Sequence, residues 1–200
     1  MVPLSLFRTP AFSVTVATGF LINVVFYGLI FVFSLFLQRQ DGLSPLATGL
    51  AFVPVTVTVM VINVLSGRFP GARWFPGTRG AIAGGALLMA AGCCVIVAAP
   101  APVAVPVVGL SVAGLGIGLI VPAITAALLG SVDRSWSGTA SGTLTALRQT
   151  GSVLGVAVFG SLLAGRGITA GLHLACEISV GLAALVVLLS LGTARRGEGR

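Results

Sequence analysis

Apolar residues gather along this chain in six long stretches, separated by short polar segments. The stretches cover residues 11–37, 46–65, 80–99, 103–129, 138–164 and 172–191. Most of them reach the roughly 20 residues that an α-helix needs to cross a bilayer core about 30 Å thick. They lack the apolar–polar alternation of barrel strands. Because backbone groups in lipid must be paired internally, the pattern predicts an all-α, polytopic membrane protein with six transmembrane helices.

Composition excludes a water-soluble domain. Of the 200 residues, 56% are hydrophobic and 8% are charged, and the mean hydropathy is +1.13. A soluble domain carries roughly 25% charged residues, so this chain could not cover a water-exposed surface. The segments between the apolar stretches are too short to fold separately. We therefore expect residues 1–200 to form one bundle whose main partner is the lipid bilayer.

The basic residues indicate how the bundle lies in the membrane. The net charge is +7, but the arginines flank the apolar stretches and form no cluster that would bind nucleic acid. With six spans, one side of the membrane holds only Arg39 and Arg166. The other side holds Arg8, Arg68, Arg73, Arg79, Arg134, Arg195, Arg196 and Arg200. The positive-inside rule then predicts a plasma-membrane protein with both termini in the cytoplasm.

The sequence offers little for catalysis or metal binding. Cys93, Cys94 and Cys176 lie inside apolar stretches, without metal-ligand spacing or a disulfide framework, so we interpret them as small buried side chains. Glu177 and His173 are the only carboxylate and histidine within the spans. An intramembrane enzyme would need paired catalytic groups. We therefore expect no catalytic residues, no metal, no cofactor and no enzymatic activity.

Polar side chains within the spans are the informative ones, because lipid-facing surfaces need only apolar residues. Asn23, Tyr27 and Gln38 recur on one face of the first span. This stripe predicts either a partly hydrated substrate cavity or hydrogen bonding between helices. We favour the cavity, because these side chains are costly to hide from water. Thr125 in the fourth span is a further candidate for its wall.

Glycines and prolines within the spans predict a tight but interrupted bundle. Pairs of glycines four residues apart let helix backbones approach closely. Pro54 and Pro122 should kink or locally open their helices. The glycines that we expect at helix contacts are Gly114, Gly118, Gly138, Gly142, Gly151 and Gly155.

The fifth span carries an arginine inside an apolar stretch. Arg148 lies about ten residues beyond Gly138, and Gln149 follows it on the opposing face. One interpretation is a gating or ion-pairing role, with Asp133 as a candidate partner. The other is that the helix extends into the cytoplasm and the arginine reaches to the membrane interface. The sequence leaves both open.

In the last span, His173 and Glu177 are four residues apart and so neighbours on one helix face. Burial disfavours a charged carboxylate, which makes Glu177 a candidate proton carrier with His173 beside it. The alternative, which we favour slightly, is that both side chains lie near the outer surface of the membrane and are hydrated.

Several local patterns occur in the order found in a known family. The chain resembles the C-terminal half of a major facilitator superfamily transporter, in the EmrB/QacA-like branch of drug/proton antiporters. The patterns are Leu6-Phe7-Arg8, Phe36-Leu37-Gln38, Gly42 to Leu50 followed by Pro54, Ser66-Gly67-Arg68, Gly114 to Gly118 followed by Pro122, Gly138 to Gly142, and Arg148-Gln149-Thr150-Gly151 with Gly155.

The resemblance implies export of amphipathic small molecules, coupled to proton entry, by alternating access between two six-helix halves. It also implies that the first and fourth helices line the cavity, in agreement with the stripe of Asn23 and Tyr27. The basic loop at residues 69–79 lacks the acidic residue usual in the family. We expect a separate N-terminal half or a second copy as partner. The alternative is a truncated membrane remnant that transports nothing by itself.

Overall fold

The computed structural model describes residues 7–68, 77–98 and 104–197, and all regular elements in these ranges are helical. Six helical spans are long and apolar enough to cross a membrane, which confirms the predicted fold class. The elements are α1 (Pro10–Arg39), α2 (Pro45–Ala51), α3 (Val53–Arg68), α4 (Thr78–Ala98), α5 (Ala104–Gly130), the short 3-10 helix η2 (Arg134–Trp136), α6 (Ser137–Arg166) and α7 (Ile168–Gly197).

The second span is broken, as its proline predicts. The Ser44 side chain caps α2 by accepting a hydrogen bond from the backbone N–H of Ala47 at 3.2 Å. α2 then ends at Ala51 and α3 begins at Val53, so Phe52 lies between two helices. Pro54 follows two residues later and has no N–H to donate to the turn before it. In contrast, α5 is assigned as one helix through Pro122.

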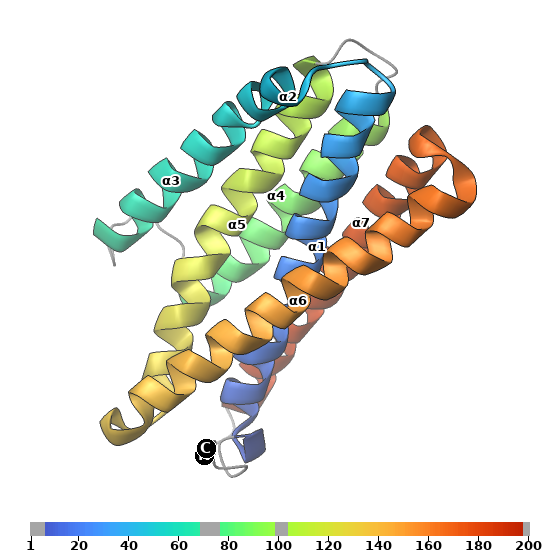
Figure 1. Ribbon diagram of the computed structural model, residues 1–200. Helices are drawn as coiled ribbons and strands as arrows, with labels where there is room; N and C mark the ends of the chain where they lie inside the picture. Colours follow the sequence, from blue (N-terminus) through green and yellow to red (C-terminus); the bar gives the residue numbers. More distant parts are fainter. Residues whose placement is uncertain (1–6, 69–76, 99–103, 198–200) are drawn as a thin grey trace.

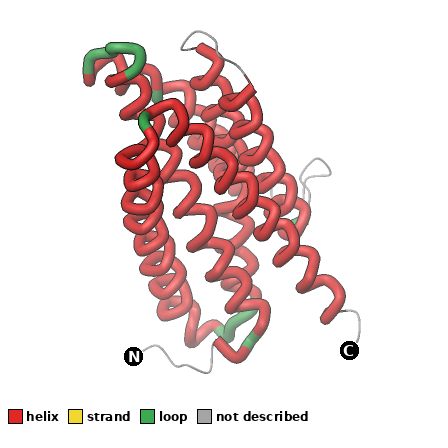
Figure 2. The backbone as a smooth tube through the Cα atoms, turned by 90° about the vertical axis from the view of Figure 1, so that its right-hand side faces the viewer, coloured by secondary structure: helices red, strands yellow, loops and turns green. Residues whose placement is uncertain are grey.

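Two helices lie at the centre of the bundle (Figures 1 and 2). α1 packs against α6, α7 and α5, and α5 packs against α4, α3 and α1. α3 and α6 lie in front of this central pair in Figure 1, whereas α4 and α7 lie behind it. The start of α1 and the end of α7 lie at the same end of the molecule (Figure 2).

The packing repeats between the first three spans and the last three. α1 contacts α6 and α7, which are the fifth and sixth spans, while α5 contacts α3 and α4, which are the second and third. Exchanging the two sets of three spans therefore leaves the main contacts unchanged. Such internal repeats of three helices are typical of membrane transport folds.

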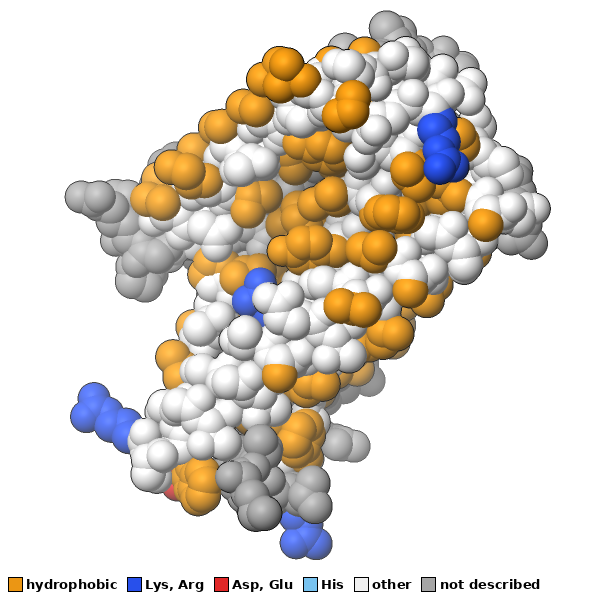
Figure 3. Space-filling model, viewed as in Figure 1, with side chains coloured by type: hydrophobic (Ala, Val, Ile, Leu, Met, Phe, Trp, Pro, Cys, Tyr) orange, Lys and Arg blue, Asp and Glu red, His pale blue; other side chains and the backbone are white. Residues whose placement is uncertain are grey.

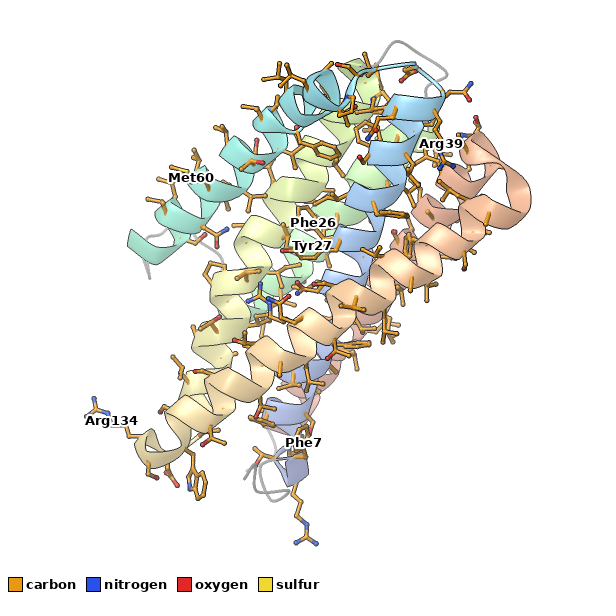
Figure 4. All side chains as sticks on the ribbon, viewed as in Figure 1. Phe7, Phe26, Tyr27, Arg39, Met60 and Arg134 are labelled. Carbon is orange, nitrogen blue, oxygen red and sulfur yellow. The ribbon has the colours of Figure 1, made fainter. Side chains whose placement is uncertain are left out.

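Apolar side chains fill the space between the helices and also cover the outside. Phe12, Phe33 and Phe159 are among the largest fully buried side chains. Hydrophobic side chains also spread along the outer side of α3, where Met60 is 65% exposed (Figures 3 and 4). The labelled basic side chains Arg39 and Arg134 lie at opposite ends of the molecule (Figure 4). This distribution suits a lipid environment rather than water.

Candidate functional site

Helices α1 and α6 touch through their backbones. An ideal Cβ atom built at Gly151 of α6 would stand 2.5 Å from the carbonyl oxygen of Phe20 in α1. One turn further along, a Cβ at Gly155 would overlap the carbonyl oxygen of Val24. On the α1 side, Gly28 admits the ring of Phe159, whose nearest carbon is 2.8 Å from the position of a Cβ. We call this contact the α1–α6 seam; the absence of side chains at Gly151 and Gly155 lets the two backbones approach closely.

Asn23 lies inside the α1–α6 seam. Its side chain is only 2% exposed, and its amide donates a hydrogen bond to the carbonyl oxygen of Gly19 at 2.8 Å. The Ser152 hydroxyl of α6 lies 3.5 Å from the Asn23 Oδ1 and 3.0 Å from the carbonyl oxygen of Arg148. Of the two interpretations of the first-span stripe, hydrogen bonding between helices describes Asn23, and this side chain faces no open surface.

The other members of the polar stripe are less buried. Tyr27 is 44% exposed and packs edge-on against Phe26, with ring centroids 5.7 Å apart. Figure 4 shows both rings on the part of α1 that lies beside α5. Gln38 is partly buried and donates to the Ser34 hydroxyl at 3.0 Å. Thr125 of α5 is partly buried and donates to the carbonyl oxygen of Val121 at 2.9 Å. Tyr27 is therefore the most accessible of these candidates.

Arg148 points from α6 toward α1. Its Cγ atom lies 3.3 Å from where a Cβ of Gly19 would be, so the missing side chain of this glycine makes room for it. The side chain is partly buried, and its Nε is fully buried with no hydrogen-bond partner. The guanidinium lies within electrostatic range of the Tyr27 hydroxyl. Arg148 and Tyr27 therefore lie in the same region beside the α1–α6 seam.

Arg148 lies well inside α6, counted from the first residue of this helix. At 1.5 Å per residue, Arg148 lies about 17 Å from the start of α6 at Ser137, and Gly19 lies about 14 Å from the start of α1 at Pro10. Half of a bilayer core is about 15 Å. Tyr27 lies still further from that end of the bundle than Gly19 does.

The candidate ion-pair partner of Arg148 lies elsewhere. Asp133 precedes η2 and is exposed, and it forms no ion pair with Arg148. Gln149 is also exposed and points away from the α1–α6 seam. The structure therefore separates the three residues that the sequence grouped as a gate.

The predicted glycine contacts are met in part. Gly114 and Gly118 of α5 pack against Val59 and Ile62 of α3. In contrast, a Cβ at Gly138 or Gly142 would meet no atom within 4 Å in the described part of the chain. These two glycines lie on the exposed side of α6, where no described helix covers them.

His173 and Glu177 lie on the exposed side of α7. Within the described residues, neither forms an ion pair with Arg148 or with any other arginine. α7 packs against α4, α1 and α6, so its exposed side faces away from the α1–α6 seam. The role of Glu177 as a proton carrier stays a prediction.

Sequence reasoning missed a second backbone contact, between α4 and α5. A Cβ at Gly85 would stand 2.6 Å from the carbonyl oxygen of Gly116, and one at Gly92 would overlap that of Gly109. These glycines are spaced seven residues apart on each helix, a signal that a search for four-residue spacing does not detect. Behind this contact, Cys93 and Cys176 are buried against each other between α4 and α7.

The comparisons with known proteins identify the family. Residues 2–156 match the family described as Major Facilitator Superfamily. The chain belongs to this superfamily. It is 34% identical over 167 residues to the methylenomycin A resistance protein of Streptomyces coelicolor, covering 82% of this chain and 34% of that protein. It is 32% identical over 165 residues to the multidrug resistance protein Stp of Mycobacterium tuberculosis, covering 82% of this chain and 30% of that protein.

A solved structure supports the superfamily fold. The crystal structure of the POT family transporter PepTSo superposes with a TM-score of 0.76 at 19% sequence identity, over 94% of this chain and 38% of that one. This chain thus spans about a third of the length of the relatives that it matches. The family match and the six apolar helices indicate a multi-pass membrane protein.

Proposed function

We propose that this superfamily member is one six-helix half of an efflux transporter that exports amphipathic small molecules across the plasma membrane. The observation that carries the proposal is the match, over 82% of the chain, to proteins named for resistance to methylenomycin A and to multiple drugs. Alternating access driven by proton antiport is the mechanism proposed from the resemblance to the EmrB/QacA-like branch.

The proposed half is the C-terminal one, and it works with a second six-helix unit. The match to 38% of PepTSo supports a half, and the order of motifs from Gly114 to Gly155 supports the C-terminal assignment. The second unit is an N-terminal half or a second copy of this chain. In this proposal both ends of the chain lie in the cytoplasm, because Phe7, which precedes Arg8, lies with Arg134 at the end of the molecule opposite Arg39 (Figure 4).

The α1–α6 seam limits how such a half can move. Gly151 and Gly155 bring the backbones of α1 and α6 into contact. Because no flexible side chain separates the backbones at these positions, the two helices move together. Tyr27 belongs to α1 and Arg148 to α6, so both residues move with this pair of helices. A rocking motion of the pair against the second unit would present them to one side of the membrane and then to the other.

Proton coupling in this proposal rests on few groups. Asp41 and Asp133 lie in the connections at the two ends of the bundle, so Glu177 with His173 is the intramembrane candidate within the described chain. Protonatable groups of the second unit are the other source. The slightly favoured expectation is that Glu177 is hydrated near the membrane surface and takes no part in proton coupling. We therefore assign proton binding to the second unit.

Accumulation of an amphipathic dye in cells that produce the complete gene product tests the proposed function. We expect less fluorescein, an amphipathic dye that carries a carboxylate, in cells with the wild-type protein than in cells without it, and loss of this difference when valinomycin and nigericin abolish the proton gradient. Arg148→Met should abolish export, whereas Cys93→Ala should not, because Cys93 is buried away from the α1–α6 seam.

Two outcomes would contradict the proposal. Equal accumulation of fluorescein and of a panel of neutral, cationic and anionic dyes, with and without the wild-type protein, would exclude efflux. Unchanged export by Arg148→Met would remove Arg148 from the transport site. Export by residues 1–200 alone would count against a second unit other than another copy of this chain.

A further inference from the structure

We propose that Arg148 and Tyr27 form an anion-binding site within the membrane, and that this site takes the carboxylate of an amphipathic small molecule. The inference rests on the proposed function, since it names the class of compound that the transporter carries. It starts from the charge balance around Arg148.

Arg148 carries a charge within the fifth candidate membrane span, and no counter-charge lies beside it in the described chain. A charged side chain at this depth is costly unless another group pairs with it. The chain has only four acidic residues. Asp41 lies beyond the end of α1, Asp133 lies beside η2, and Glu177 lies on the exposed side of α7; the fourth is outside the described residues. None of these three described carboxylates pairs with Arg148.

The hydrogen-bonding groups of Arg148 also lack a partner. Its Nε is fully buried without a hydrogen bond, which is costly for a donor of this strength. A guanidinium presents its donors as a planar fork that matches a carboxylate through two parallel hydrogen bonds. A carboxylate that reaches the exposed part of this side chain would therefore pair with the charge of the guanidinium.

The surroundings favour an anion that carries an apolar body. Tyr27 adds a hydroxyl donor within electrostatic range of the guanidinium, and its exposed ring offers an apolar surface. Asn23 is buried in the α1–α6 seam, and no carboxylate lies in this part of the described chain. Hydrophobic and uncharged side chains cover most of the face between α3 and α6 (Figure 3). A cationic compound would instead be repelled by Arg148.

The same chemistry could come from an acidic side chain of the second unit. In that case the guanidinium would already be neutralised, and the protein would bind a carboxylate and its neutral analogue equally. The test therefore compares two probes of one shape, naphthalene-2-carboxylate and naphthalene-2-carboxamide. Equilibrium dialysis of the complete gene product in detergent measures the affinity for each.

We expect the wild-type protein to bind the carboxylate at least about tenfold more tightly than the amide, as charge-assisted hydrogen bonds would give. Arg148→Gln should remove this preference, and Arg148→Lys should keep part of it, because lysine retains the charge without the fork. Tyr27→Phe should weaken carboxylate binding several-fold and leave the amide unchanged. Arg39→Gln is the matched control, since Arg39 is exposed at the opposite end of the molecule from Arg134, and it should bind like the wild type.

Equal affinity of the wild-type protein for the two probes would overturn the site, as would a preference that survives Arg148→Gln. Size-exclusion profiles and melting temperatures establish that each variant is folded. If Arg148→Gln does not fold, the weaker carboxylate binding expected for Arg148→Lys and Tyr27→Phe still tests the anion site. The dye-export assay is independent of this measurement: export without a carboxylate preference refutes the anion site alone, and the reverse result refutes efflux alone.

Discussion

The carbonyl oxygen of Phe20 in α1 occupies the space that a side chain at Gly151 of α6 would need. An ideal Cβ at position 151 would stand 2.5 Å from that oxygen, closer than real Cβ atoms approach backbone. Because the obstacle is backbone, it cannot rotate away as the end of a flexible side chain could. The position of Arg148, one turn earlier on α6, therefore depends on a residue without a side chain.

Gly151→Ala should separate α1 from α6 and destabilise the folded protein. Overpacking of a tight contact typically costs about 1–3 kcal/mol, which would lower the melting temperature measured in detergent by several degrees. Gly181→Ala is the control, because a Cβ there would meet nothing within 4 Å in the described chain. The tight packing assigned to Gly151 would be contradicted if Gly151→Ala and Gly181→Ala melted at the same temperature as the wild type.

Cysteine labelling should distinguish Tyr27 from Asn23. In a background without Cys93, Cys94 and Cys176, we expect Tyr27→Cys to react with a charged, membrane-impermeant methanethiosulfonate much faster than Asn23→Cys. The reason is that Tyr27 is 44% exposed whereas Asn23 is 2% exposed inside the α1–α6 seam. Mass spectrometry of the labelled protein gives both rates. Faster labelling at position 23 would mean that the cavity interpretation holds for Asn23 after all.

Glu177→Gln should leave export and its dependence on the proton gradient unchanged. Glu177 lies on the exposed side of α7, and α7 packs behind the central pair of helices rather than beside Tyr27. Dye export by cells at several external pH values measures both properties. A loss of gradient-driven export in Glu177→Gln, with normal amounts of folded protein, would make Glu177 the proton carrier instead.

Much of the fold could be predicted from the sequence, because the solvent dictates it. In lipid, an apolar stretch of sufficient length must form a helix, so the six spans were predictable, and the break before Pro54 follows from a missing N–H. The observed helices extend past several of the predicted ends. Apolar composition stops at the edge of the bilayer core, whereas the hydrogen bonds of a helix continue into the polar region.

The candidate site was predictable only one helix at a time. Periodicity identified the face shared by Asn23 and Tyr27, but it could not say that α6 covers Asn23 and leaves Tyr27 open. Likewise, spacing alone treated Gly142 and Gly155 alike, although only Gly155 meets another helix in the described chain. Which faces meet depends on contacts between segments distant in sequence, and one sequence carries no direct record of these.

The contact between α1 and α6 has an electrical consequence. Because the backbones of these helices touch, a displacement of α6 along the membrane normal would carry both Arg148 and α1 with it. A unit charge that crosses a potential of 100 mV gains or loses about 2.3 kcal/mol, and a partial crossing involves a proportional share. The transmembrane voltage therefore exerts a force on this helix pair whenever the arginine is not neutralised.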